Sequence, residues 1–270
     1  MTPLVEHPLQ AGSSGASVMA THVAKRCDAA VCGQCEQPCV LGTLQCGLRL
    51  DLREFPELKE RQLARGDYLF HASGAFESLY AVRSGMLKVS VLTEDGREQI
   101  TGFFLPGDLV GLDSVGLRQH ASSAAAIDDT VVCELPFAVL ERHGQSVPRI
   151  QAALFRMLSG QIRREQSTLL LLGSLRAEER LAQFLIDLSE RVHSDTQCGS
   201  AIGMPMTREE IGSYLGLKLE TVSRTLSKMH RDGVIEVVKR GVRIRQVDRL
   251  RRLAGLAVRP QGDSAHRRGH

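Results

Sequence analysis

The sequence contains no tryptophan, and no stretch of its 270 residues approaches the roughly 18 consecutive apolar residues that span a membrane. Residues 1–26 also lack a positively charged start followed by an apolar core, so we expect no secretory signal there. Their polar, low-complexity composition predicts a disordered lead. Because the sequence predicts neither a membrane span nor a secretory signal, the chain is expected to lie in the cytoplasm and to have no membrane partner.

Charge is unevenly distributed along the chain. The net charge is only +3, but residues 205–259 contain thirteen Lys or Arg against six Asp or Glu. The rest of the chain is therefore mildly acidic. A basic C-terminal module favours a polyanionic partner such as DNA, although a solvated helix face would have a similar composition.

Five of the seven cysteines lie in one stretch, CDAAVCGQCEQPCVLGTLQC, which runs from Cys27 to Cys46. Structural disulfides are rare in the cytoplasm, and an odd number of cysteines does not suit a pure disulfide framework. This cysteine loop, residues 27–46, therefore predicts metal binding or redox chemistry. An iron–sulfur cluster, structural zinc and a thiol redox switch all remain possible from the spacing alone.

The next zone, residues 47–145, predicts an antiparallel β-roll after a short helical segment. Short apolar and β-branched runs alternate with Gly-containing turn signals, a pattern typical of barrels and rolls. Asp95-Gly96 is the strongest hairpin signal. The runs are YLF, SLYAV, LKVSVL, QITGFFL and TVVCELPF.

Residues 146–174 predict a long dimerisation helix, and a second helix is expected from Ala177 to about Val192. Apolar residues recur at heptad spacing along the first helix, which predicts a parallel dimer; an ordinary helix packed on the roll is the alternative. Glu165 interrupts the apolar seam, so the Glu165 carboxylates of two copies would repel one another there. The dimer is therefore expected to associate reversibly rather than permanently. The seam residues are Leu158, Ile162, Glu165, Leu169 and Leu172.

Residues 175–258 predict a winged helix-turn-helix, and residues 259–270 a disordered tail. Thr207 and Glu210 have the spacing of a capping box, and Gly216 suits the turn between two short helices. The following VIEVVKRGVRI, with Gly241 at a turn, fits a β-wing. Two short helices at this spacing place the second in the major groove of DNA.

Several polar side chains are expected on the outward side of that second helix. Arg224 has the geometry to donate two hydrogen bonds to guanine, and Glu220 to accept from cytosine, while Ser223 suits either base or phosphate. Arg208, Lys228 and Arg231 are placed for phosphates. A winged helix used only for protein contacts is the alternative. The predicted DNA-binding residues are Arg208, Lys218, Glu220, Thr221, Ser223 and Arg224.

The order of roll, long helix and helix-turn-helix gives an α+β fold that resembles the CRP/FNR superfamily of bacterial transcription regulators. Within it, the chain is most similar to the oxygen-responsive FNR (fumarate and nitrate reduction) branch, from about Cys32 to Gly255. ETVSR, Glu220–Arg224, matches the E-x-x-S-R pattern of the family's recognition helix. The resemblance implies a homodimer on a palindromic TTGAT…ATCAA site that controls anaerobic gene expression. The other similar stretches are SLYAVRSGMLKV, EDGREQITGFFLPGDLVGLD, VVCELPF and LLLLGSLRAEERLAQFL.

The same resemblance implies a [4Fe-4S] cluster held by three N-terminal cysteines and one from the roll. On this basis the expected ligands are Cys32, Cys35, Cys39 and Cys133. The N-terminal spacing is shorter than the family's C-x2-C-x5-C, so Cys27 and Cys46 remain alternatives. Cys198 is expected to be a bystander.

Other partners and functions follow from the same comparison. Cyclic-nucleotide sensors of the superfamily use an Arg-Ser pair after a Gly-Glu-Leu segment; here Gly107-Asp108-Leu109 is followed by LRQHASSAAA, so no cyclic nucleotide is expected. The turn Thr93–Glu98 is implied to contact RNA polymerase. A regulator with another effector, such as nitric oxide, is the main alternative. An iron–sulfur enzyme is disfavoured because no catalytic motif is present.

Overall fold

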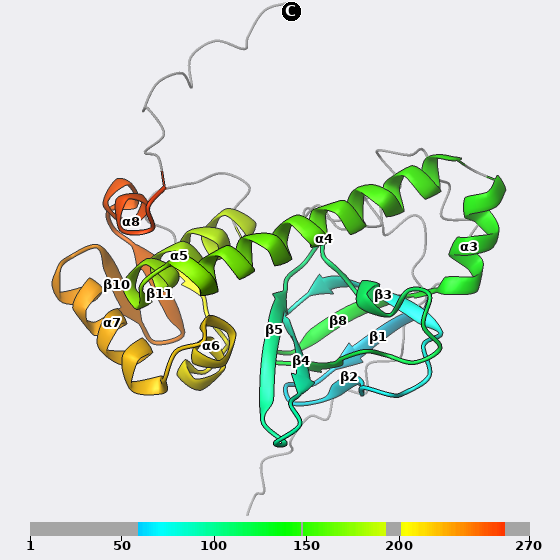
Figure 1. Ribbon diagram of the computed structural model, residues 1–270, viewed down its shortest axis with the longest axis horizontal. Coiled ribbons are helices and arrows are strands. Elements are labelled where there is room, and N and C mark those ends of the chain that lie inside the picture. Colours follow the sequence, from blue (N-terminus) through cyan, green and yellow to red (C-terminus); the bar gives the residue numbers. More distant parts are fainter. Residues whose placement is uncertain (1–58, 147, 193–200, 257–270) are drawn as a thin grey trace, which may run out of the picture.

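The structure is a computed structural model that describes residues 59–146, 148–192 and 201–256. The predicted lead, cysteine loop and tail lie outside these ranges. The described chain has the predicted α+β order: a β-roll, a long helix, and a C-terminal winged helix-turn-helix (Figure 1). None of the helices in these ranges combines the length and apolar character that crossing a bilayer requires.

The roll consists of two four-stranded antiparallel sheets. One has the order β1 (Lys59–Leu63), β8 (Thr130–Pro136), β3 (Ser78–Ser84), β6 (Leu109–Val110). The other has the order β2 (Tyr68–Phe70), β7 (Ser123–Ala126), β4 (Leu87–Leu92), β5 (Glu98–Phe104). A 3-10 turn, Leu112–Ser114, follows β6. Apolar side chains from both sheets, including fully buried Val82, Leu87 and Val132, form the core between them.

All five predicted apolar runs contribute to strands, and the Asp95-Gly96 hairpin is confirmed. Gly96 has a φ of 79°, in the left-handed region that glycine adopts without steric cost, and it lies in the turn between β4 and β5. The amide of Thr93 donates to the carbonyl of Arg97 at 2.9 Å and closes the loop. β5 has no partner strand on its outer edge within its sheet.

Three parts of the roll differ from or add to the sequence expectation. Helix α3 (Phe137–Ser146) begins where the last apolar run was expected to continue, because Pro136 ends the strand and Phe137 is already helical. Strand β7 consists of Ser and Ala, which have little intrinsic strand preference, and pairs with both β2 and β4. The first described residues form strand β1; the expected helical segment before them lies outside the described ranges.

Helix α4 (Pro148–Ser174) spans from the roll to the winged helix-turn-helix, and α5 (Ala177–Val192) follows after a short joint (Figure 1). Pro148 is at the first helical position, where its missing N–H costs nothing. Leu171 is buried in the core that joins the roll to the C-terminal part, but Leu170 is 70% exposed. These two adjacent leucines therefore lie on different faces of α4, one packed in the core and one at the surface.

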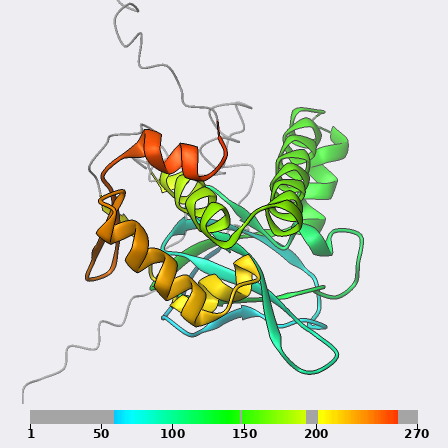
Figure 2. The ribbon, with the colours of Figure 1, turned by 60° about the vertical axis from the view of Figure 1, so that its left-hand side comes forward.

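The C-terminal part packs α5 with α6 (Arg208–Leu215), α7 (Leu219–Arg231) and α8 (Val247–Leu253) beside a three-stranded antiparallel sheet (Figure 2). The sheet has the order β10 (Ile235–Val238), β11 (Gly241–Ile244), β9 (Ala201–Gly203). Gly241 starts β11 rather than occupying the wing turn, which is formed by Lys239 and Arg240. A Cβ at position 241 would lie 2.0 Å from the carbonyl oxygen of Ile202, so the close strand pairing requires glycine.

Candidate nucleic-acid interface and sensor site

The recognition helix α7 buries one face and exposes the opposite one. Val222, Leu226 and Met229 are buried in the core, as the sequence predicted. On the other side Lys218, Glu220 and Arg224 are exposed, and Thr221 and Ser223 are half-buried. The structure therefore brings the predicted base-contacting side chains to one accessible face.

Helix α6 supports α7 and begins with the predicted capping box. The Thr207 hydroxyl accepts from the amide of Glu210 at 3.1 Å, and the Glu210 carboxylate accepts from the amide of Thr207 at 2.7 Å. Gly216 ends the helix in the left-handed conformation at a φ of 61°. These local interactions fix the turn from which α7 emerges.

The cations beside α7 are not equally available. Lys228 donates to Glu178 of α5 at 2.7 Å, and this hydrogen bond raises the pKa of Lys228. Arg208 is half-buried at the start of α6, and burial lowers the pKa of its guanidinium. Arg224 and Arg231 are both exposed. The structure thus leaves Arg224 better presented to DNA than Lys228.

Cys133, the predicted ligand from the roll, lies in the middle of β8. Val132 belongs to the core between the sheets, and alternation along a strand turns Cys133 to the opposite, outer face. Cys133 is nevertheless 0% exposed. The residue opposite it on β1 is Glu60, whose carboxylate is paired with Arg83 at 2.5 Å. The thiol is thus buried on the face that points away from the roll's own core.

Cys32, Cys35 and Cys39 lie outside the described residues, as do the alternatives Cys27 and Cys46. Within the described part of the chain, no three His, Cys, Asp or Glu side chains gather as a complete metal site.

An apolar stripe on α4 is uncovered in the single chain. Phe155, Ile162 and Leu169 are 58%, 53% and 69% exposed, and they recur every seven residues. Among the other predicted seam residues, Leu158 is half-buried and Glu165 is exposed. Phe155 extends the seam by one heptad beyond the sequence prediction, and the same spacing would have identified it.

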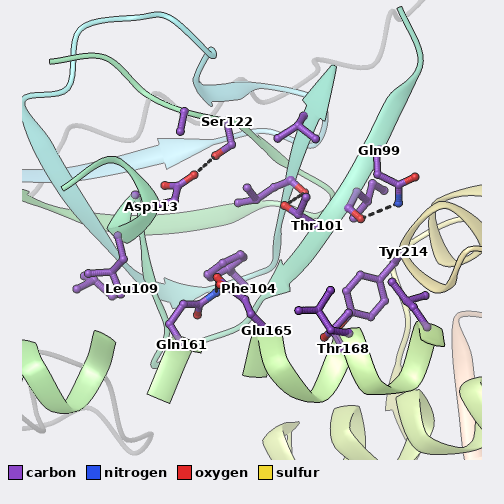
Figure 3. A pocket seen from close by; sticks show the side chains of 18 of the residues that line it. Gln99, Thr101, Phe104, Leu109, Asp113, Ser122, Gln161, Glu165, Thr168 and Tyr214 are labelled. Atoms are coloured by element: carbon purple, nitrogen blue, oxygen red, sulfur yellow. Dashed lines mark hydrogen bonds between the residues drawn. The ribbon is translucent and has the colours of Figure 1, made fainter. Parts of the chain in front are cut away.

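A pocket of about 560 Å³ lies between α4, the strands β4 and β5, and the end of α6 (Figure 3). Asp113 and Glu165 are the charged residues among those lining it, and no Lys, Arg or His is present in that lining. The Asp113 carboxylate accepts from the hydroxyl of Ser122 at 2.6 Å. The charge in the pocket is therefore negative.

Asp108, from the Gly107-Asp108-Leu109 segment, has a structural role that the sequence did not indicate. Its carboxylate accepts from the guanidinium of Arg191 on α5, and Arg164 of α4 lies 3.9 Å from its other oxygen. The amide of Leu105 donates to Asp108 at 2.8 Å. This carboxylate therefore connects the roll to both long helices.

The winged helix-turn-helix also packs directly on the roll. The Ser213 hydroxyl of α6 accepts from the amide of Ile100 on the edge strand β5 at 2.9 Å, and Gln99 donates to the carbonyl of Ser213. Lys88 of β4 pairs with Glu210 at 3.2 Å. Sequence reasoning missed these residues because each contact joins segments that are distant along the chain.

Comparison with known proteins agrees with both halves of this structure. Residues 60–145 match the cyclic nucleotide-binding domain family, and residues 179–253 match the Crp-like helix-turn-helix domain family. The fumarate nitrate reduction regulatory protein of Klebsiella oxytoca is 38% identical over 226 residues, which are 82% of this chain and 90% of that protein. The chain belongs to the CRP/FNR family. It is an FNR-like transcription regulator with a CRP-type DNA-binding domain.

Other relatives support the same assignment. The fumarate and nitrate reduction regulatory protein of Escherichia coli strain K12 is 38% identical over 224 residues, 81% of this chain and 90% of that protein. FixK2 from Bradyrhizobium japonicum superposes with a TM-score of 0.68 at 34% identity, covering 74% of this chain and 98% of that one. The curated relatives are named as regulatory proteins rather than enzymes, which agrees with the sequence expectation.

Proposed function

We propose that this chain is an oxygen-responsive transcription regulator that binds a [4Fe-4S] cluster and controls anaerobic gene expression from the cytoplasm. It would act as a homodimer on a palindromic TTGAT…ATCAA site. The names of its relatives, which refer to fumarate and nitrate reduction, support the anaerobic role. The structural observation that carries the proposal is the placement of Cys133.

Cys133 fits a cluster ligand. A thiolate is the usual ligand of such clusters, and its charge is tolerated where nearby carboxylates are neutralised. The ion pair between Arg83 and Glu60 provides that neutralisation beside Cys133. Cys32, Cys35 and Cys39 would complete the set from outside the described residues. When bound, the cluster would supply the centre that reacts with oxygen.

The dimer is supported by the exposed stripe on α4. A second copy would cover Phe155, Ile162 and Leu169, and each of these side chains gains about 25 cal/mol per Å² of apolar area buried. Opposed Glu165 side chains would weaken the same interface. Dimerisation and cluster binding would then be linked equilibria. Loss of the cluster in oxygen would weaken the dimer and, with it, binding to the palindromic DNA site.

Cyclic nucleotides are not proposed as ligands. A cyclic phosphate in the pocket would meet the carboxylates of Asp113 and Glu165 without a lining cation. Asp108, in the segment that corresponds to the family's Gly-Glu-Leu, is already paired with Arg191.

Contact between the Thr93–Glu98 turn and RNA polymerase is proposed on family resemblance alone.

The test is the iron, acid-labile sulfide and zinc content of anaerobically purified protein, wild type against Cys133→Ser. We expect about four iron and four sulfide per wild-type chain, a visible absorbance that bleaches in air, and loss of most of the iron in the variant. Cys198→Ser is the matched control and should keep its iron. Stoichiometric zinc, or equal iron in wild type and Cys133→Ser, would contradict the proposal.

A further inference from the structure

The joint between α4 and α5 contains one side chain that connects three segments of backbone. Arg180, in the first turns of α5, donates from Nε to the carbonyl of Leu175 at 2.9 Å. Its Nη2 donates to the carbonyl of Leu172 at 2.8 Å, and its Nη1 donates to the carbonyl of Leu215 at 3.0 Å. These acceptors lie in the last turn of α4, in the joint itself, and at the end of α6.

The three acceptors explain why an arginine is needed. The last carbonyls of a helix have no partner within the helix, and the negative end of the helix dipole favours a cation there. One guanidinium satisfies two such ends at once. Its planar fork points donors in fixed directions, whereas a lysine ammonium is a point charge on a flexible stem and would not hold all three carbonyls in one geometry.

The surroundings of Arg180 leave little freedom at this joint. Gly216, the turn residue that follows α6, is so close that a Cβ there would lie 3.4 Å from both Nη1 of Arg180 and a methyl group of Leu172. The other side of α6 is held on strand β5 through Ser213. Helix α6 is therefore fixed between the end of the proposed dimer helix and the roll.

The position of α6 determines the position of the recognition helix. Only Gly216, Leu217 and Lys218 separate α6 from α7. In a dimer joined along α4, the angle at the joint would set the distance and rotation between the two α7 helices. Paired recognition helices contact half-sites about one helical turn apart, so this angle determines which half-site spacing fits.

We propose that Arg180 is a positioning residue that sets the half-site spacing accepted by the dimer, without itself contacting a base. The inference rests on the proposed homodimer and its palindromic site. Loss of the three-way contact should let the DNA-binding modules swing relative to α4. The variant would then accept several spacings, each with less affinity than the wild type has for its preferred one.

The experiment compares full-length, anaerobically purified wild type, Arg180→Lys and Arg176→Lys. Affinities are measured for the palindrome, for palindromes with one base pair added to or removed from the spacer, and for a single half-site. Arg176→Lys is the matched control, because Arg176 lies in the same joint and its side chain is exposed. Arg180→Lys keeps the positive charge but loses the planar guanidinium that donates to the three carbonyls.

We expect the wild type and Arg176→Lys to lose at least about tenfold in affinity when the spacer changes by one base pair, since each such step shifts one half-site by about 3.4 Å and rotates it. For Arg180→Lys the loss should fall below about threefold, while binding to the single half-site stays within about twofold of wild type. If Arg180 only stabilised the fold of the module, Arg180→Lys would lower the affinity for all spacers alike and leave the spacing preference unchanged.

Three results would overturn the inference. The first is an Arg180→Lys protein that keeps the wild-type spacing preference, and the second is a wild type that binds all spacings equally. The third is an Arg180→Lys protein that does not bind even the single half-site. In the last case Arg180 would maintain the fold of the module rather than its angle. Equal wild-type affinity for the palindrome and the single half-site would contradict the proposed dimer, and this inference with it.

Discussion

In the winged helix-turn-helix, the predicted base contacts Glu220, Ser223 and Arg224 lie along the first two turns of α7. The proposed cluster ligands are instead divided between residues 27–46, outside the described ranges, and strand β8. The DNA-binding face is determined locally, by a capping box, one left-handed glycine and a three-residue buried stripe. The sensor site depends on bringing distant segments together. Changes at one region should therefore leave the local structure of the other largely intact. The two regions are coupled through α4 and its joint, and through the contacts of α6 with strands β4 and β5.

The largest expected effect is loss of specific DNA binding in Arg224→Ala. Each bidentate contact to guanine contributes about 1–3 kcal/mol, so losing two in a dimer should reduce affinity for the palindrome at least about thirtyfold. Gel-shift titration measures this, and iron content should not change. Arg231→Ala is the control, because loss of a phosphate contact should weaken binding to specific and nonspecific DNA equally. A fall in iron content of Arg224→Ala would show that the two regions are not separable.

A smaller effect is expected at the seam that connects the two regions. Glu165 is exposed on α4 and accepts a hydrogen bond from Gln161 at 3.1 Å. Removing the paired like charges in Glu165→Ala should raise the dimer association constant of metal-free protein by up to about tenfold. Sedimentation velocity measures the dimer fraction, with the exposed neighbour Gln166→Ala as control. Unchanged sedimentation of the metal-free Glu165→Ala protein would exclude the proposed repulsion.

The smallest effect is a pH dependence confined to the roll. His120 is 4% exposed and stacks on Phe70 with ring centroids 3.7 Å apart. Burial lowers the pKa of His120, and the carboxylate of Asp113 offsets this only in part. Because the folded pKa lies below the unfolded one, the unfolded chain binds the proton first as pH falls. The contribution to stability is therefore complete above about pH 6.5 and decreases below it.

Thermal unfolding at pH 7.5 and pH 5.5 tests this expectation. The melting temperature of the wild type should fall more than that of His120→Phe, which keeps an aromatic ring beside Phe70 but has no titratable group. DNA affinity should show no such difference between the two proteins at either pH. An equal fall in the two melting temperatures would show that titration of His120 does not cause the pH dependence.

The sequence predicted most of what depends on short-range pattern. The capping box of Thr207 and Glu210 is one example, since both residues and their acceptors lie within one turn of chain. The glycine of the Asp95-Gly96 hairpin is another. The seven-residue period on α4 likewise identified Ile162 and Leu169 of the uncovered stripe, but it missed Phe155 and included Leu158, which is half-buried.

The features that were not predicted depend on tertiary contacts. Strand β7 is stabilised by two neighbouring strands rather than by the propensity of Ser and Ala. The three hydrogen bonds of Arg180 join α5 to the ends of α4 and α6, and Ser213 bonds to a strand of another domain. No local pattern distinguishes these side chains from ordinary polar residues. The face to which Cys133 points also required the sheet register.

The most direct test of the account compares the same anaerobically purified sample before and after exposure to air. Its affinity for the TTGAT…ATCAA palindrome is measured together with its iron content and its visible absorbance. The account predicts that iron and absorbance are lost together and that affinity for the palindrome falls at least about tenfold, while affinity for a single half-site changes little. Equal affinity for the palindrome after the iron has been lost would contradict it.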